Sequence, residues 1–272
     1  GIVTDLFGIE GEVAVVTGAL GKLGPVWIET LLNRGASVFA LDLAQAKIPP
    51  DYKKLQERFD ESRLLLDRGD VRDRESLEAA CQNCCQTFGI PSILVNNAGI
   101  DRPPGETGKG YRLEDIPFEI NREILEVNTL GAFLVTQVFG RQMVQASRGS
   151  IINIGSLYAG VAPDGRFYDH IKSDPPFLKP PAYGASKAAL VNLTRYLATL
   201  WAPHGVRVNA LSPGGVLGSQ DEEFKRKFCD RVPLGKMATV EDLAGPLLFL
   251  ASRASSYVTG IELVVDGGFT AW

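Results

Sequence analysis

The chain has 272 residues, of which 45% are hydrophobic and 22% are charged, a composition typical of an ordinary globular protein. Its formal net charge is −4 and its pI is about 5.4, so we expect no nucleic-acid-binding surface. No apolar run approaches the roughly 20 residues that span a membrane, and we expect a cytoplasmic protein without a membrane partner.

The first part of the chain alternates short apolar runs with helical patterns. Residues 12–17 (EVAVVT) form an apolar, β-branched run that predicts a buried parallel strand. A glycine-rich turn follows, and Pro25 opens a predicted helix that ends before Gly35. Residues 37–41 (SVFAL) predict a second strand, which is closed by Asp42.

This order of strand, glycine turn, helix, strand and acid is typical of a dinucleotide-binding unit. Glycines let the backbone approach a pyrophosphate, and the helix N-terminus favours its negative charge. The acid accepts hydrogen bonds from the adenosine ribose. A purely structural glycine turn is the alternative. The cofactor-binding residues predicted in this unit are Gly18, Leu20, Lys22, Leu23 and Asp42.

The alternation of strands and helices continues to the end of the chain. Further strands are predicted at residues 64–67, 93–96, 150–154, 206–211 and 261–265, and helices at residues 74–88, 118–147, 183–202, 222–229 and 240–251. This pattern predicts an α/β fold, a single domain over residues 1–272 with one doubly wound parallel sheet of the Rossmann type. In such sheets ligands bind beyond the carboxyl ends of the strands. The polar or turn residues expected at that edge are Asp42, Asp70, Asn97, Ser156 and Pro213.

A tyrosine and a lysine stand four residues apart in the sequence YGASK, as Tyr183 and Lys187. Residues with this spacing project from the same face of a helix. A free tyrosine loses its proton only near pH ~10, and an ammonium one turn away favours the phenolate. The pair could therefore transfer protons, although an isolated Tyr-x-x-x-Lys match is more often an exposed helix pair.

Three of the four cysteines, Cys81, Cys84 and Cys85, fall in one predicted helix. Cys81-x-x-Cys84 could be half of a metal site, but the sequence has no second such pair and only two histidines. We therefore expect reduced thiols and no metal.

Taken together, these motifs resemble those of the short-chain dehydrogenase/reductase family over nearly the whole chain. The resemblance is carried by TGALGKLG, Asp70-Val71, NNAG, Asn128, Ser156, YGASK, VRVNALSPGG and the VTG…VDGG ending. In that family the serine orients the substrate oxygen and the tyrosine transfers the proton. The lysine lowers the tyrosine pKa and holds the nicotinamide ribose, and the asparagine positions a water in a proton relay. The resemblance assigns these roles to Ser156, Tyr183, Lys187 and Asn128.

The resemblance also implies cofactor contacts beyond the glycine turn. These fall on Asp70, Val71, Asn97, Ala98, Gly99, Tyr183, Lys187, Pro213 and Val216. A purely structural role is the alternative for three of the predicted site residues. Ser156 could be a turn residue or cap, Asn128 a hydrogen-bonded buried polar group, and Asn97 a residue that only holds the chain after its strand.

The sequence departs from the family pattern in three places. Lys22 replaces the usual second glycine of the turn, the usual threonine after SPGG is missing, and Ser156 and Tyr183 lie about twice as far apart as usual. Read as Gly18-x-x-Gly21-x-x-Gly24, the turn resembles that of nucleotide-sugar epimerases or dehydratases. Those relatives carry a separate substrate domain, and we expect this chain to be too short to contain one.

The resemblance implies an NAD(P)-dependent oxidoreductase that interconverts an alcohol and a carbonyl by hydride transfer, with a sugar or sugar derivative as the expected substrate. A 3-oxoacyl thioester or polyol oxidoreductase and a non-catalytic dinucleotide-binding protein are the alternatives. Asp42, with no arginine directly after it, favours NAD(H) over NADP(H), and Lys22 is the opposing signal. The predicted helix at residues 118–147 and residues 188–202 are apolar on several faces, which predicts a homotetramer or at least a dimer.

Residues 157–182 are predicted to be an inserted substrate loop that acts as a lid. The segment runs from Ser156 to Tyr183, so both of its ends adjoin the predicted chemistry, and its three cations are matched by three aspartates. A loop that only packs on a neighbouring subunit is the alternative. The substrate contacts predicted in it are Tyr158, Arg166 and His170.

Overall fold

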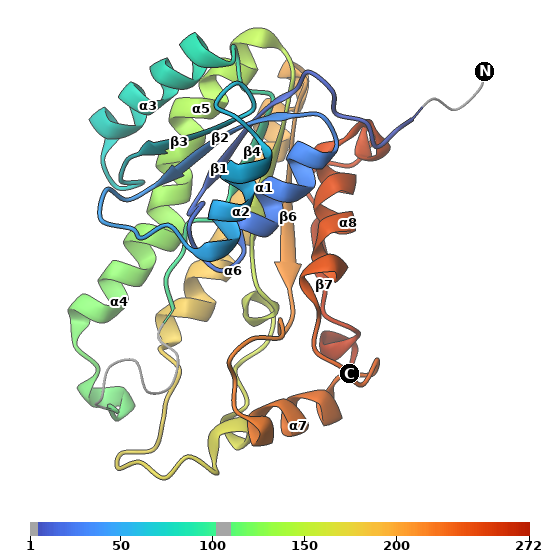
Figure 1. Ribbon diagram of the computed structural model, residues 1–272. Coiled ribbons are helices and arrows are strands. Elements are labelled where there is room, and N and C mark those ends of the chain that lie inside the picture. The colour runs from blue at the N-terminus through green and yellow to red at the C-terminus, as the bar shows by residue number, and fades with distance from the viewer. Residues whose placement is uncertain (1–4, 102–109) are drawn as a thin grey trace.

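The computed structural model describes residues 5–101 and 110–272, which form an α/β fold around one parallel sheet (Figure 1). The seven strands are in the order β3-β2-β1-β4-β5-β6-β7, and every neighbouring pair is parallel. The strands are β1 (Val13–Thr17), β2 (Ser37–Asp42), β3 (Leu64–Arg68), β4 (Ile93–Asn96), β5 (Gly149–Ile154), β6 (Val206–Pro213) and β7 (Glu262–Val265). The predicted fold class is confirmed.

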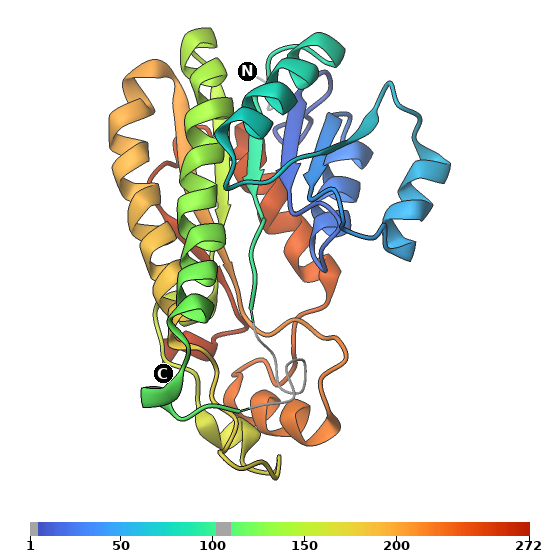
Figure 2. The same cartoon turned by 90° about the vertical axis from the view of Figure 1, so that its left-hand side faces the viewer.

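Helices cover both faces of the sheet, which the two views show as three layers (Figures 1 and 2). They are α1 (Gly24–Asn33), α2 (Pro50–Arg58), α3 (Arg74–Thr87), α4 (Phe118–Leu125), α5 (Ala132–Ala146), α6 (Pro181–Trp201), α7 (Glu222–Arg231) and α8 (Val240–Ala251). One apolar core joins the sheet to α1, α2 and α8, and a second joins it to α3, α5 and α6.

The central strand β1 is mainly apolar because both sides of the sheet are covered. In β1, Ala14 and Val16 belong to the core under α1, whereas Val13 and Val15 belong to the core under α3 and α5. All five residues of the strand are buried. Continuous apolar runs are what a parallel sheet with two covered faces requires.

Two helical predictions were wrong in detail. The single helix predicted at residues 118–147 is divided into α4, a π-helical stretch (Glu126–Gly131) and α5. Helix α2 was not predicted, because only Tyr52 and Leu55 among its residues are buried and its apolar pattern is correspondingly weak.

Buried side-chain hydrogen bonds tie the centre of the sheet to the helices above it. Asn96 at the end of β4 donates from Nδ2 to Asn153 Oδ1 of β5 over 2.8 Å and to Thr136 Oγ1 of α5 over 3.0 Å. Asn153 Nδ2 donates in turn to Thr194 Oγ1 of α6 over 2.9 Å. Because buried amide groups are costly to leave without partners, this chain of bonds fixes how α6 lies on the sheet.

In the described part of the chain, no helix has the length and apolar character that crossing a membrane requires.

Candidate functional site

The turn after β1 is held closely against the end of β4. Gly18 has a φ of 60°, and a Cβ at this position would lie 2.7 Å from the Cα of Ala98. Thr17 Oγ1 accepts hydrogen bonds from the backbone N–H groups of Asn97 and Ala98, each over 3.1 Å. Only glycine combines this positive φ with so close an approach, so the turn offers bare backbone at the edge of the sheet.

Asn97 uses its whole side chain to fasten this turn. Its Nδ2 donates to the carbonyl oxygens of Thr17 and Gly18, over 3.2 and 3.0 Å, and its Oδ1 accepts from Trp27 Nε1 of α1 over 2.8 Å. A Cβ on Gly24, the first residue of α1, would lie 2.3 Å from Ala19 O. Turn, helix and strand end therefore form one rigid unit, and Asn97 holds the chain whether or not it also contacts a ligand.

An acidic side chain stands where the second strand ends. Asp42 accepts from Leu20 N over 2.8 Å through Oδ2 and from Leu43 N over 2.7 Å through Oδ1. Leu20 thus serves Asp42 through its backbone and is not among the cavity-lining residues. Lys22 donates to Val216 O over 3.3 Å, and partial burial lowers the pKa of its ammonium.

A cavity of about 1100 Å³ runs along the carboxyl ends of the strands. It begins at the glycine turn, passes Asp42 and ends under the segment before α6. The predicted cofactor residues that line it are Gly18, Lys22, Leu23, Asp42, Asp70, Val71, Asn97, Ala98, Gly99, Tyr183, Lys187, Pro213 and Val216. A glycine cradle that a Cβ would fill and a carboxylate at the end of β2 suit the pyrophosphate and the ribose of a dinucleotide.

Ser156, Tyr183 and Lys187 come together at the far end of this cavity. Burial, aided by the carboxylate of Asp101, raises the pKa of Tyr183 to about 12, and a hydrogen bond with Ser156 acts in the opposite direction. Lys187 is 5% exposed and donates to Ile154 O over 2.8 Å. Burial lowers the pKa of Lys187 to about 8, against the opposing effect of Asp101. Below about pH 8 the ammonium is therefore charged, with Nζ 5.9 Å from the centroid of the Tyr183 ring.

Asn128 is fully buried in the π-helical stretch and is not among the lining residues of the cavity. Its Oδ1 accepts from Ile100 N over 2.8 Å, and its Nδ2 donates to Ile100 O over 3.0 Å and to Ser186 Oγ over 3.1 Å. The side chain thus joins the segment after β4 to α6. Its part in a proton relay stays a prediction.

The segment predicted as a lid, residues 157–182, packs on α7 and on the end of the chain. The ring of Phe167 lies 6.0 Å from Phe224, 5.5 Å from Phe228 and 6.2 Å from Phe269, between ring centroids. Other residues of the segment line the cavity. They are Leu157, Tyr158, Tyr168, Ile171 and Lys179.

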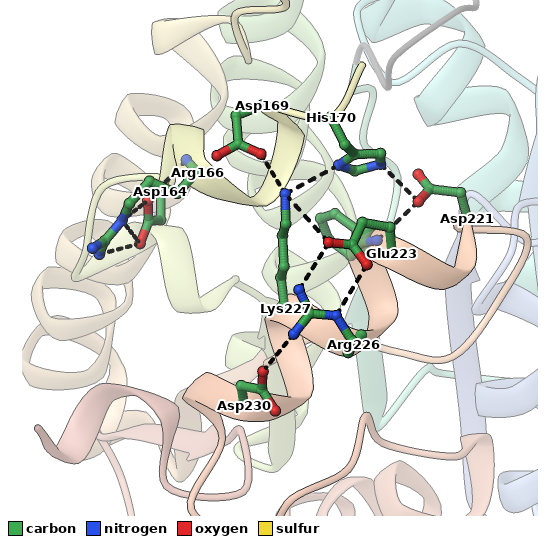
Figure 3. Close-up of polar contacts among 10 residues, drawn as sticks. Asp164, Arg166, Asp169, His170, Asp221, Glu223, Arg226, Lys227 and Asp230 are labelled. Atoms are coloured by element: carbon green, nitrogen blue, oxygen red, sulfur yellow. Dashed lines mark hydrogen bonds and ion pairs between the residues drawn. The ribbon is translucent and has the colours of Figure 1, made fainter.

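Of the three predicted substrate contacts, only Tyr158 lines the cavity, and the positions of Arg166 and His170 correct the prediction (Figure 3). The Arg166 side chain is 83% exposed and is paired with Asp164. His170 bonds through Nε2 to Asp221 over 2.8 Å and lies 3.4 Å from Lys227 Nζ. His170 joins the lid to α7, whereas Arg166 is held within the lid by Asp164, and neither side chain lines the cavity.

Two charged residues that sequence reasoning missed stand beside Tyr183. Lys179 Nζ contacts Asp101 Oδ2 over 2.5 Å and lies 4.7 Å from the ring centroid of Tyr183 and 5.4 Å from that of Tyr158. The sequence analysis matched the charge of Lys179 with the aspartates of the lid, whereas its partner, Asp101, lies 78 positions away in the sequence. The only available signal was that Asp101 follows NNAG and Lys179 precedes YGASK.

The cysteines lie outside this site. Cys81 and Cys84 are buried on α3, and all four cysteines are free. Burial raises the pKa of the Cys81 thiol to about 12. Among residues 5–101 and 110–272, no group of three or more His, Cys, Asp or Glu side chains could hold a metal ion.

Comparisons with known proteins agree with this geometry. The sequence profile described as enoyl-(acyl carrier protein) reductase matches residues 23–270. An NAD-dependent glycerol dehydrogenase of Listeria innocua is 33% identical and covers 97% of this chain and 96% of its own. A galactitol 2-dehydrogenase of Rhizobium johnstonii is 33% identical, with 98% of each chain covered. The crystal structure of a gluconate 5-dehydrogenase from Burkholderia cenocepacia, in complex with NADP and tartrate, is 29% identical, covers 98% of each chain and has a TM-score of 0.83.

We expect Tyr183→Phe to remove turnover while leaving dinucleotide affinity nearly unchanged. The phenol is the predicted proton-transfer group, and a lost general acid–base lowers kcat by about 10²–10⁴-fold, whereas Asp42 and the glycine turn lie at the other end of the cavity. Steady-state kinetics and cofactor titration measure the two effects separately. Tyr196→Phe, on the same helix but 65% exposed, is the matched control. Appreciable turnover by Tyr183→Phe would contradict the assignment.

Proposed function

Since this chain belongs to the short-chain dehydrogenase/reductase family, whose members use NAD or NADP to interconvert alcohols and carbonyls, we propose that its substrate is a neutral polyol and its product the corresponding ketose. The observation that carries the proposal is the polar wall beside Tyr183. Tyr158, Tyr168 and the Lys179–Asp101 pair all line the cavity there. Hydroxyl and charged groups of this kind are suited to a ligand with several hydroxyls.

The charges at this end of the cavity favour a neutral substrate over a sugar acid. A carboxylate is bound best by a cation that is not already neutralised. Lys179 is paired with Asp101, and Asp221 adds another carboxylate to the lining. Lys187 lies beside Tyr183, where its charge serves the proton-transfer group.

A 3-oxoacyl thioester is the second candidate, and one observation favours it. Phe224, Phe228 and Met237 also line the cavity, next to Leu157. An acyl chain would gain from burial against these side chains. Lys179 of the polar wall lies 4.7 Å from the ring centroid of Tyr183, however, so we keep the polyol as the first proposal.

In the mechanism that we propose, some side chains hold the cofactor and two others, Ser156 and Tyr183, act at the reacting carbon. Asp42 would hold the adenosine ribose, the glycine turn the pyrophosphate, and Lys187 the nicotinamide ribose. A nicotinamide bound there supplies the hydride donor or acceptor. Ser156 orients the substrate oxygen, and Tyr183 gives its proton to that oxygen in reduction and takes it back in oxidation.

Lys187 and the lid support this proton transfer. While its ammonium is charged, Lys187 favours the phenolate form of Tyr183. We propose that residues 157–182 act as a lid, with Tyr158 and Tyr168 against the substrate. A lid that excludes water strengthens the electrostatic interactions around the reacting oxygen.

A panel of substrates tests the polyol proposal. We expect kcat/KM for galactitol and arabinitol to exceed that for gluconate and for a hydroxyacyl thioester, because only the polyols match the polar, charge-balanced wall. The reaction is followed at the nicotinamide absorbance in both directions, with NAD and with NADP. A highest kcat/KM for gluconate or for the thioester would replace the polyol with that class.

We further propose that NAD(H) is preferred over NADP(H), since Asp42 would repel a 2′-phosphate. Arg68 donates to the carbonyl oxygens of Leu43 and Ala46, and Arg72 is held by Asp70, so the nearby arginines are engaged. Asp42→Asn keeps an acceptor for Leu20 N while removing the charge, and we expect it to reduce the NAD preference by about 10-fold or more. Cofactor kinetics of both proteins measure this. A wild-type kcat/KM for NADP equal to that for NAD would sink the proposal.

We also propose a homotetramer, or at least a dimer, assembled through α4, α5 and α6. Large apolar side chains are exposed there, among them Phe118 (70%) and Leu200 (51%), and exposed apolar patches mark protein interfaces. Light scattering at micromolar concentration should give a multiple of the 29.4 kDa chain mass. Leu200→Glu should lower that mass, whereas Ile90→Glu, exposed between α3 and β4, should not. A monomeric wild-type protein would contradict the assembly.

We propose a cytoplasmic location because of the cysteines. All four cysteines are free, and reduced thiols are usual in that compartment. The net charge of −4 also gives no support for a nucleic-acid partner.

A further inference from the structure

We propose that Lys179 and Asp101 form the pair that recognises the substrate hydroxyl next to the reacting carbon. The inference rests on the proposed polyol function and adds to it the residues that set specificity. The two side chains come from segments far apart in sequence, Asp101 from the chain after β4 and Lys179 from the end of the lid, and both line the cavity.

The position of Lys179 is the first step of the argument. Its side chain is 11% exposed, and its ammonium lies over the rings of both Tyr183 and Tyr158. By distance to the ring centroid, Lys179 is closer to Tyr183 than Lys187 is, 4.7 against 5.9 Å. A group bound to Lys179 would therefore lie near Tyr183, whose hydroxyl would bind the reacting oxygen.

The hydrogen-bonding capacity of Lys179 is the second step. An ammonium has three N–H donors. Within the described part of the chain, the one acceptor recorded for Lys179 is Asp101, and its other neighbours are the faces of the two rings. A mostly buried ammonium that keeps free donors is costly unless a ligand completes its shell, and those donors face the cavity in which substrate binds.

The pairing decides which chemical group completes that shell. A hydroxyl can accept from Lys179 and donate to Asp101 at the same time, which gives two charge-assisted hydrogen bonds. A carboxylate could accept from Lys179 but would meet the negative charge of Asp101. An apolar carbon would satisfy neither residue. The pair therefore selects a hydroxyl on the carbon next to the reacting one.

Butane-2,3-diol and butan-2-ol provide the test, since they differ only by the hydroxyl in question. We expect the wild-type enzyme to prefer the diol and Lys179→Met to lower kcat/KM for the diol by about 10–100-fold, as expected for a lost hydrogen bond to a charged group. The value for butan-2-ol should stay within a few-fold. Lys179→Arg should restore part of the preference. Lys172→Met is the matched control, because Lys172 is an exposed lid lysine that is not among the lining residues.

A binding measurement separates recognition from catalysis. In the Tyr183→Phe background with NAD bound, calorimetric titration should show weaker galactitol binding when Lys179→Met is added, by a factor similar to that found in kcat/KM. Asp101→Asn should raise kcat/KM for gluconate relative to galactitol, because it removes the negative charge beside Lys179. If Lys179 had a purely structural role, its replacement would lower activity towards butane-2,3-diol and butan-2-ol equally.

Three results would overturn the pair as the recognition element. The first is a wild-type enzyme that does not prefer butane-2,3-diol to butan-2-ol, and the second is an unchanged preference in Lys179→Met. The third is an equal loss of kcat/KM for both alcohols in that variant. Failure of the proposed function would look different, because gluconate or the thioester would then give the highest kcat/KM in the substrate panel.

Discussion

The hydrogen bonds between the ends of β1 and β4 are the constraint on which the rest of the site depends. The strand order reverses direction at this point, since β2 lies on one side of β1 and β4 on the other. Thr17 and Asn97 close the two strand ends on each other, and Trp27 joins the first helix to them. A parallel sheet has a crevice at such a reversal, and these bonds hold the strand ends at its base in place.

The catalytic end is positioned by a second set of buried polar contacts. Asn128 joins Ile100 to Ser186, and Asn153 joins β5 to Thr194 of α6. The contacts of both asparagines end on α6, which carries the tyrosine and lysine of the YGASK sequence. Proton-transfer groups need sub-ångström placement to be effective, and the predicted ones are positioned here by amide side chains that do not line the cavity.

The sequence predicted the fold and the gathering of Ser156, Tyr183 and Lys187 at one cavity because their signals are local. Strand runs, the glycine turn and YGASK each lie within a few residues, and parallel topology then brings them to one edge. The sequence could not show which face of the lid is turned inward, so Arg166 and His170 were placed wrongly. It could not pair Lys179 with Asp101 either, because a charge pair between distant segments leaves no periodic pattern. Helix α2 was missed for a related reason, since two buried residues make a weak signal.

The aromatic cluster under the lid ties three distant parts of the chain together. Phe167, Phe224 and Phe269 come from the lid, α7 and the carboxyl-terminal segment, and their rings are in contact. A change of lid sequence alone would leave a mismatched ring surface on the other two. We therefore expect a transplant of substrate range from one relative to another to require all three segments together. The aromatic cluster, rather than the loop alone, is then the part of the structure that has to be exchanged.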